Sequence, residues 1–191
     1  TPLIALDGYD FTGGLLIQDG KLLGARYLGD ARATRWFDPA MAATQARIDA
    51  LLPDTRNLVS LAARPATPFV LVTSYSDVQP GRYALFNGET GRLTVIGESQ
   101  PQIRAAQMSA QQLVRYPARD GLAIPAWLTV PRQGTGRQLP LVVLVHGGPY
   151  VRGASWQWDG QVQFLASRGY AVLQPEYRGS TGFGSRHFRA G

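Results

Sequence analysis

The chain has 191 residues, a formal net charge of +6, 45% hydrophobic residues and 17% charged residues. This composition is typical of a globular protein of one or two domains, and it excludes disordered, collagen-like and acidic-tail classes. The sequence contains no cysteine, which excludes disulfides, cysteine nucleophiles and thiolate metal sites.

The positive charge is almost entirely arginine, spaced singly along the chain from Arg26 to Arg189. A nucleic-acid-binding protein gathers its basic residues on one face or in one run, so we expect dispersed surface arginines and no nucleic-acid partner. With His146 and His187 as the only histidines, we expect no metal site and no cofactor.

The longest uninterrupted apolar run, residues 141–145, is far shorter than the roughly 18 residues of a membrane-spanning helix. We therefore expect no transmembrane helix and no membrane partner, and the sequence also shows no signal segment. Because the chain opens at Thr1, we expect an internal piece of a longer protein. Its compartment, cytoplasmic or periplasmic, and its oligomeric state stay open.

The first half predicts short strands separated by turns. Residues 15–18 and 22–28 are joined by Asp19-Gly20, a strong hairpin dipeptide. A helix follows, with Asp38 as its cap and Pro39 in its first turn, and Pro53 ends it. Four further strands are predicted at residues 58–62, 69–75, 83–86 and 93–96, with Pro65 in the turn after the first of them.

Four short antiparallel strands in about 40 residues is the size of one β-propeller blade. A lone blade would expose both faces, because repeats bury their core against neighbours. We therefore expect residues 1–112 to be the C-terminal part of a β-propeller, with its last blade at about 57–97. A small standalone β-sheet is the alternative.

The second half predicts a change of architecture. Residues 103–113 form a polar connector with a helical turn, and Asp120-Gly121 joins strands at 114–118 and 124–130. After a Gly-rich loop at 133–138, residues 141–145 are typical of a strand covered on both faces. A helix at 159–168 and a second buried strand at 170–173 complete a strand–helix–strand unit of an α/β sheet.

The motif His146-Gly147-Gly148-Pro149 directly follows the predicted buried strand. Glycines here allow a sharp turn and leave backbone N–H groups unshielded, and such groups at the carboxyl end of a strand can stabilise an oxyanion. A structural Gly-Gly turn explains the same residues equally well.

A second glycine-rich loop, residues 177–184, follows the next strand and includes Arg178, Gly179, Ser180 and Gly182. It lacks the Gly-Lys-Ser/Thr of a phosphate-binding loop. Two interpretations stay open, a structural turn with Arg178 in a salt bridge and a direct catalytic role.

These residues carry a family resemblance. The sequence of residues 139–191, LPLVVLVHGGPYVRGASWQWDGQVQFLASRGYAVLQPEYRGSTGFGSRHFRAG, resembles the start of the catalytic domain of the prolyl oligopeptidase family of serine peptidases, in its acylaminoacyl-peptidase and dipeptidyl-aminopeptidase-like branch. YPARDGLAIPAWLTVP is similar to the hairpin that opens this domain. WFDPAMAATQARIDALLPDTRN and TSYSDVQPGRYALFNGETGRL resemble the end of its propeller.

The resemblance implies a mixed β and α/β chain: the end of a β-propeller, then the truncated N-terminal part of an α/β-hydrolase domain at 113–191. It implies that the Gly148 N–H is one oxyanion donor and that His146, Gly147 and Pro149 support that loop. It also places Arg178, Gly179, Ser180 and Gly182 in a loop near the site. Glu176 stands where many relatives have asparagine, which puts a direct substrate role in doubt.

The family's Ser-Asp-His triad is expected downstream of this chain. No serine here has the Gly-x-Ser-x-Gly pattern, and His187 lies too close to the end to be the triad base, so we expect a partly exposed structural residue there. The whole protein is expected to hydrolyse peptides through an acyl-enzyme, and this chain alone to be inactive. A lipase-like esterase and a non-catalytic β-rich binding module are the alternatives.

Overall fold

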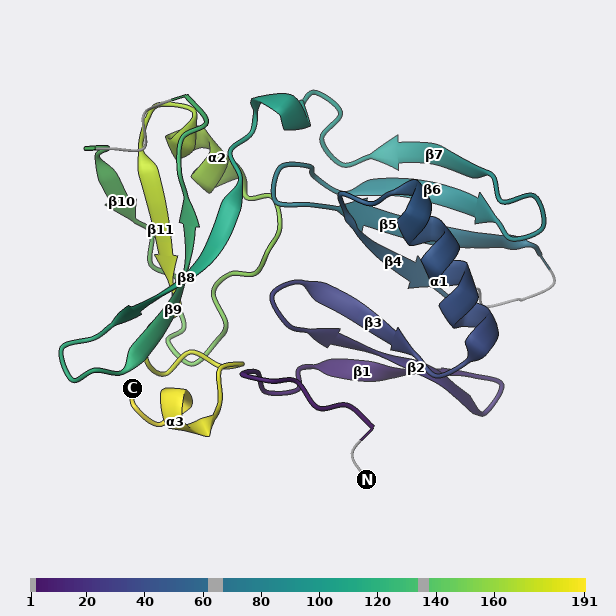
Figure 1. The fold of residues 1–191 in the computed structure, drawn as a ribbon, viewed down its shortest axis with the longest axis horizontal. Coiled ribbons are helices and arrows are strands. Elements are labelled where there is room, and N and C mark those ends of the chain that lie inside the picture. The colour runs from purple at the N-terminus through teal and green to yellow at the C-terminus, as the bar shows by residue number, and fades with distance from the viewer. Residues whose placement is uncertain (1–2, 62–66, 134–137) are drawn as a thin grey trace.

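The computed structural model describes residues 3–61, 67–133 and 138–191 (Figure 1). The chain begins with a three-stranded antiparallel sheet of β1 (Gly13–Gln18), β2 (Lys21–Leu28) and β3 (Arg32–Trp36), in that order. The predicted hairpin is confirmed: Asp19 and Gly20 both have positive φ, as a tight two-residue turn requires. β3 was not predicted.

The helix α1 (Pro39–Leu51) begins as the sequence indicates. The Asp38 side chain accepts a hydrogen bond of 2.8 Å from the Met41 N–H, and Pro39 occupies the first turn, where no intrahelical donor is needed. α1 lies over a second sheet (Figure 1), and its fully buried Ile48 joins the main apolar core. The other buried members of that core are Val59, Val72, Ala84 and Phe86.

This second sheet is antiparallel, and its strands follow chain order: β4 (Arg56–Ser60), β5 (Phe69–Tyr75), β6 (Arg82–Asn87) and β7 (Leu93–Glu98). The four strands predicted between residues 58 and 96 are therefore confirmed as one sheet. The predicted end of the first strand at Ala62 and the turn at Pro65 lie outside the described residues.

The second half starts with the 3-10 turn η1 (Ala105–Gln107) and the hairpin of β8 (Gln111–Pro117) and β9 (Ala123–Thr129). The elements β10 (Leu141–Val143), α2 (Gly160–Ala166), β11 (Ala171–Pro175) and α3 (Ser185–Phe188) follow. The sheet order is β10-β11-β9-β8, and β10 pairs with β11 in parallel. The predicted strand–helix–strand unit is thus confirmed, whereas most of the predicted loop at 133–138 lies outside the described residues.

The described residues do not cover the strand predicted at 141–145 on both faces. β10 is the edge strand of its sheet, and the side chains of Leu141 and Val143 are 55% and 53% exposed. An apolar run indicates a strand, but the number of neighbours that cover it is a tertiary property that the run does not encode.

Buried polar groups join the two halves. The Gln163 side chain of α2 accepts from the Ser109 N–H at 2.9 Å and donates to the Ser109 carbonyl at 2.8 Å and the Asp77 carbonyl at 3.2 Å. The Asp77 carboxylate in turn accepts from the Gln111 N–H at 2.7 Å. These hydrogen bonds connect α2 to the connector and to the turn that follows β5 of the second sheet.

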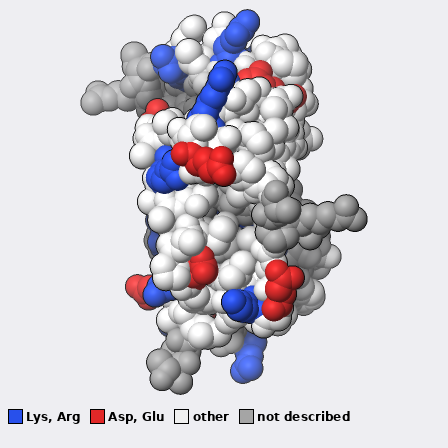
Figure 2. All heavy atoms as spheres, turned by 90° about the vertical axis from the view of Figure 1, so that its right-hand side faces the viewer, with Lys and Arg blue, Asp and Glu red and all other residues white. Residues whose placement is uncertain are grey.

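Figure 2 shows one face of the molecule, on which basic and acidic side chains are interspersed rather than gathered in one patch. This agrees with the dispersed arginines expected from the sequence. Among the described residues, no helix has the length and apolar character needed to cross a membrane.

Candidate active site

Two glycine-rich loops form the candidate site: the first loop, residues 144–159, follows β10, and the second loop, residues 177–184, follows β11. They lie side by side because β10 and β11 are parallel, so the chain leaves both strands at the same edge of the sheet. His146 from the first loop and Ser180 from the second meet there, with His146 Nε2 3.1 Å from Ser180 Oγ. His146 Nδ1 lies 2.7 Å from the Gly147 carbonyl oxygen. Because a carbonyl oxygen only accepts, Nδ1 is the donor in its contact with Gly147, and the direction of the Nε2–Ser180 contact depends on whether Nε2 also carries a proton.

The His146 ring is in close contact with Tyr177 and Gly153. The Tyr177 ring stacks on one face with centroids 4.3 Å apart, and the Tyr177 hydroxyl donates to the His146 carbonyl at 2.7 Å. Gly153 packs so closely against the ring that a Cβ there would lie 2.0 Å from His146 Cδ2. Only glycine permits this approach.

Glu176 directly follows β11 and binds the backbone of Gly153 and Ala154, further along the first loop. Its fully buried carboxylate accepts from the Gly153 N–H at 3.0 Å and from the Ala154 N–H at 2.5 Å. Its Oε2 also lies 3.7 Å from His146 Nε2. A buried carboxylate is tolerated only with such partners, so Glu176 and the loop determine each other's position.

Ser180, His146 and Glu176 do not form a catalytic triad. In a triad the acid holds the ring nitrogen opposite the one that faces the serine. Here Ser180 and Glu176 both approach Nε2, while Nδ1 faces the Gly147 carbonyl. Ser180 and Glu176 are also fully buried, so no substrate carbonyl reaches the hydroxyl.

Gly148 has a backbone conformation that excludes other residues. Its φ is +141°, and a Cβ would lie 2.8 Å from Val151 Cγ2 and 3.2 Å from the Tyr150 nitrogen. The turn is closed by the Val151 N–H, which donates to the Pro149 carbonyl at 2.9 Å, and the Gly148–Pro149 peptide is cis. The Gly148 N–H has no hydrogen-bond partner within the described residues, so it is available to an acceptor.

Arg178 forms a salt bridge, as expected if its loop is a structural turn. Its Nη1 and Nη2 lie 3.0 and 2.9 Å from the two carboxylate oxygens of Asp120, in the β8–β9 turn. This bidentate contact lowers the pKa of Asp120 to about 2 and raises the pKa of Arg178. Gly179 and Gly182 lie against Tyr150 and Arg152 of the first loop, so the loops pack on each other.

The expectation that His187 is partly exposed is wrong. His187 lies in α3, is only 5% exposed and has Nε2 3.0 Å from the Tyr177 carbonyl oxygen. α3 folds back under the second loop, and a four-residue helix has too short an apolar pattern to be predicted. Sequence reasoning also missed Arg152 and Gly153, whose roles depend on contacts far along the chain.

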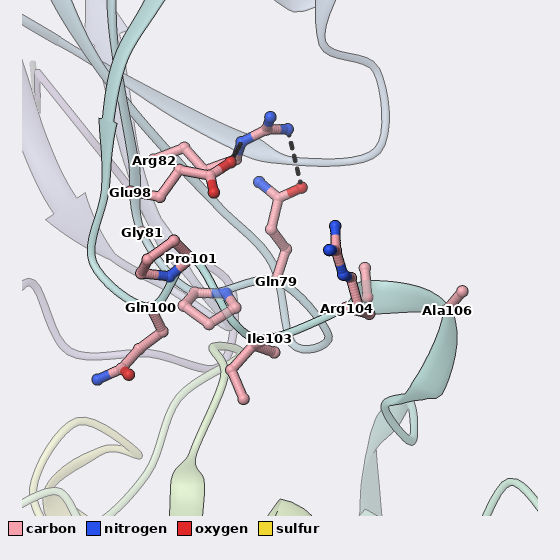
Figure 3. A pocket seen from close by; sticks show the side chains of 11 residues that line it. Gln79, Gly81, Arg82, Glu98, Gln100, Pro101, Ile103, Arg104 and Ala106 are labelled. Atoms are coloured by element: carbon pink, nitrogen blue, oxygen red, sulfur yellow. Dashed lines mark hydrogen bonds and ion pairs between the residues drawn. The ribbon is translucent and has the colours of Figure 1, made fainter.

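Figure 3 shows a cavity of about 290 Å³ in the first half, where β6, β7 and the connector meet. Its charged groups are Arg104 and a pair formed by Arg82 and Glu98, whose nitrogen and oxygen lie 2.8 Å apart. None of its lining residues is a serine or a histidine, and both loops lie outside it. The chemistry expected from the sequence does not belong to this cavity.

The chain combines two antiparallel sheets with a mixed four-stranded sheet, in which α2 connects the parallel strands β10 and β11. No family model matches the chain. It is 34% identical over 162 residues to dipeptidyl aminopeptidase BIII of Pseudoxanthomonas mexicana, covering 81% of the chain and 23% of that protein. Puromycin hydrolase is 28% identical, with a TM-score of 0.53 over 72% of the chain and 21% of that structure.

The acylaminoacyl peptidase of Pyrococcus horikoshii shares the fold, with a TM-score of 0.57 and 16% identity over 95% of the chain and 28% of that structure. These comparisons confirm the resemblance: the chain is homologous to a segment of peptidases of the prolyl oligopeptidase family. It spans less than a third of the length of each of these three proteins.

Proposed function

We propose that the protein containing this chain is a serine-type peptidase that hydrolyses peptide bonds of oligopeptides through an acyl-enzyme, and that the Gly148 N–H is one donor of its oxyanion hole. The observation that carries the proposal is the Gly148 N–H, which has no hydrogen-bond partner among the described residues. It lies after the parallel strand β10, in an exposed turn that the hydrogen bond from the Val151 N–H to the Pro149 carbonyl closes. The names of the relatives favour a peptidase over the esterase and binding-module alternatives.

In the proposed reaction, a serine oxygen outside this chain attacks the peptide carbonyl carbon, and its proton passes to a histidine. The carbonyl electron pair moves onto oxygen, and this oxyanion accepts a hydrogen bond from the Gly148 N–H. The amine then leaves with the histidine's proton, and water hydrolyses the acyl-enzyme. The donor contributes mainly in the transition state, where the negative charge develops.

We also propose that residues 1–112 form the C-terminal part of a β-propeller, with its last blade at about 57–97, and residues 113–191 the N-terminal part of a hydrolase domain. Supporting this, apolar side chains remain exposed on the first two sheets, including Leu15, Ile17, Leu71 and Val95. Neighbouring blades would cover such surfaces. Arg178, Gly179, Ser180 and Gly182 then support the site rather than react.

The test uses the full-length protein, dipeptidyl and acyl-aminoacyl fluorogenic amides, and a fluorophosphonate probe. The proposal predicts amide hydrolysis and stoichiometric labelling of one serine outside residues 1–191, with no labelling or turnover by residues 1–191 alone. Labelling of Ser155, Ser180 or Ser185, or the absence of both labelling and turnover in the full-length protein, contradicts it.

A further inference from the structure

Both loops of the candidate site are hydrogen-bonded to the N-terminal part of the chain. In the first loop, Arg152 Nη2 donates to the Gly29 carbonyl at 2.6 Å and the Trp156 N–H donates to the Asp30 carbonyl at 2.8 Å. In the second loop, the Gly184 N–H donates to the Asp10 carboxylate at 3.0 Å, and Asp10 N–H donates to the Gly182 carbonyl at 3.1 Å. Figure 1 shows the N-terminal segment running beside these loops.

Arg152 makes the most specific of these contacts. Its guanidinium lies 5.2 Å from the centroid of the Tyr9 ring and 4.8 Å from that of Phe183, so a side chain from each half of the molecule stacks on it. Burial lowers its pKa, although Glu176, Asp30 and Tyr9 favour the charged form. The Tyr9 and Phe183 rings also contact each other, with centroids 5.6 Å apart, so the guanidinium lies beside a pair of packed rings. A planar, delocalised cation can contact both rings and still donate at its edges, which lysine does not do.

The same side chain also holds the first loop. Arg152 Nε donates to the Ala154 carbonyl at 3.2 Å, and the Ala154 N–H donates to buried Glu176. The residue before Arg152, Val151, closes the turn on Pro149 and lies against Gly148. A displacement of Arg152 is therefore passed to Gly148 through a short turn in which Val151 contacts both Pro149 and Gly148.

From these contacts we infer that Arg152 is a positioning residue, through which docking of the N-terminal segment and the β2–β3 turn sets the orientation of the Gly148 N–H. This inference rests on the proposed function. Catalysis depends on such positioning, since a misplacement of about 1 Å can cost about 100-fold in rate. Hence the N-terminal segment contributes to turnover without contacting the reacting atoms.

The Arg152 side chain can be replaced without preventing the protein from folding. Arg152 Nη1 is buried without a hydrogen-bond partner among the described residues. A buried donor without a partner destabilises the folded state, and this cost offsets part of the stability that the other hydrogen bonds of Arg152 provide. Methionine is unbranched, flexible and apolar, so it can pack beside the Tyr9 and Phe183 rings without burying a charge, and Arg152→Met is expected to fold.

The experiment compares Arg152→Met, Arg152→Lys and Tyr9→Leu in the full-length protein with Arg35→Met, an exposed arginine of β3, as the control. We expect kcat to fall about 10- to 100-fold in Arg152→Met with KM within about twofold, and lysine to restore little of it. We expect Tyr9→Leu to lower kcat several-fold, but to have no further effect in the Arg152→Met background.

Deuterium uptake at residues 147–156 gives a readout that needs no turnover. It should rise in Arg152→Met and Tyr9→Leu and stay unchanged in Arg35→Met. Normal kcat or unchanged uptake in Arg152→Met, or multiplicative effects in the double variant, overturns the inference. If the wild-type protein shows neither turnover nor probe labelling, the proposed function is contradicted instead. The deuterium-uptake comparison then still tests whether Arg152 links the N-terminal segment to the Gly148 turn.

Discussion

Gly153→Ala tests how the candidate site is held together. Gly153 is not among the glycines with positive φ, so its backbone accepts alanine, and the cost comes from the new methyl group. That group would lie 2.0 Å from His146 Cδ2 and 2.4 Å from Cγ. Because carbon atoms pack at about 3.5–4.0 Å, the ring has to move by about 1.5–2 Å.

This movement breaks the 3.1 Å contact between His146 Nε2 and Ser180 Oγ and disturbs the stack on Tyr177. Leaving the buried Ser180 hydroxyl without its partner costs about 1–3 kcal/mol, and overpacking costs a similar amount. We therefore expect Gly153→Ala to destabilise the domain by about 2–4 kcal/mol. Denaturant unfolding of the full-length protein measures this change.

His146→Ala supplies the control, because it removes the ring that the new methyl group meets. In the double variant the cost of Gly153→Ala should almost vanish, so the coupling energy should be close to the full cost of about 2–4 kcal/mol. Additive effects, or a Gly153→Ala protein within about 0.5 kcal/mol of the wild type, would refute the reasoning that Gly153 and His146 occupy one packed unit.

Three further predictions concern other parts of the structure. Gly148→Ala should lower kcat of the full-length enzyme about 100- to 1000-fold with little change in KM, because φ is +141° and the turn has no room for a Cβ. The pKa of Asp120 is about 2, below its ordinary value of 3.8. The pair with Arg178 therefore stabilises the fold fully above about pH 4, and this stabilisation decreases as the pH falls toward 2. Carboxyl NMR titration should show this pKa return toward 3.8 in Arg178→Met. Gln163→Ala, which removes the hydrogen bonds to Ser109 and Asp77, should lower the free energy of unfolding by about 2–4 kcal/mol in a denaturant titration.

The controls use neighbouring residues. His146→Ala should lower kcat less than Gly148→Ala, and the reverse order would move the donor role to the imidazole. An Asp120 pKa that stays near 2 in Arg178→Met would assign the shift to another cause. Gln161→Ala on the exposed face of α2 should be near neutral, and an equal loss there would contradict the role of Gln163.

Local signals in the sequence predicted much of the fold. Asp38 and Pro39 define the start of α1 because capping depends on adjacent residues, and Asp19-Gly20 defines a hairpin for the same reason. β3 was missed because two arginines interrupt its pattern. The exposure of β10 and the burial of His187 could not be predicted, since both depend on what packs against them.

The candidate site was predicted in part. His146 and Ser180 were singled out in separate loops, but their contact spans 34 positions and follows from the parallel pairing of β10 and β11. The sequence argued against a direct substrate role for Glu176, and its hydrogen bonds to the first loop give it a structural role. Arg152 had no local signal, because its partner Gly29 lies 123 positions away.

The central claim is that the Gly148 N–H stabilises the oxyanion of a serine peptidase. The most direct measurement is a crystal structure of the full-length protein after reaction with a dipeptidyl phosphonate, whose phosphoryl oxygen occupies the position of the oxyanion. The account predicts that this oxygen lies about 2.7–3.1 Å from the Gly148 nitrogen, with the phosphorus bonded to a serine outside residues 1–191. A phosphoryl oxygen held by other donors, with the Gly148 N–H directed elsewhere, would contradict it.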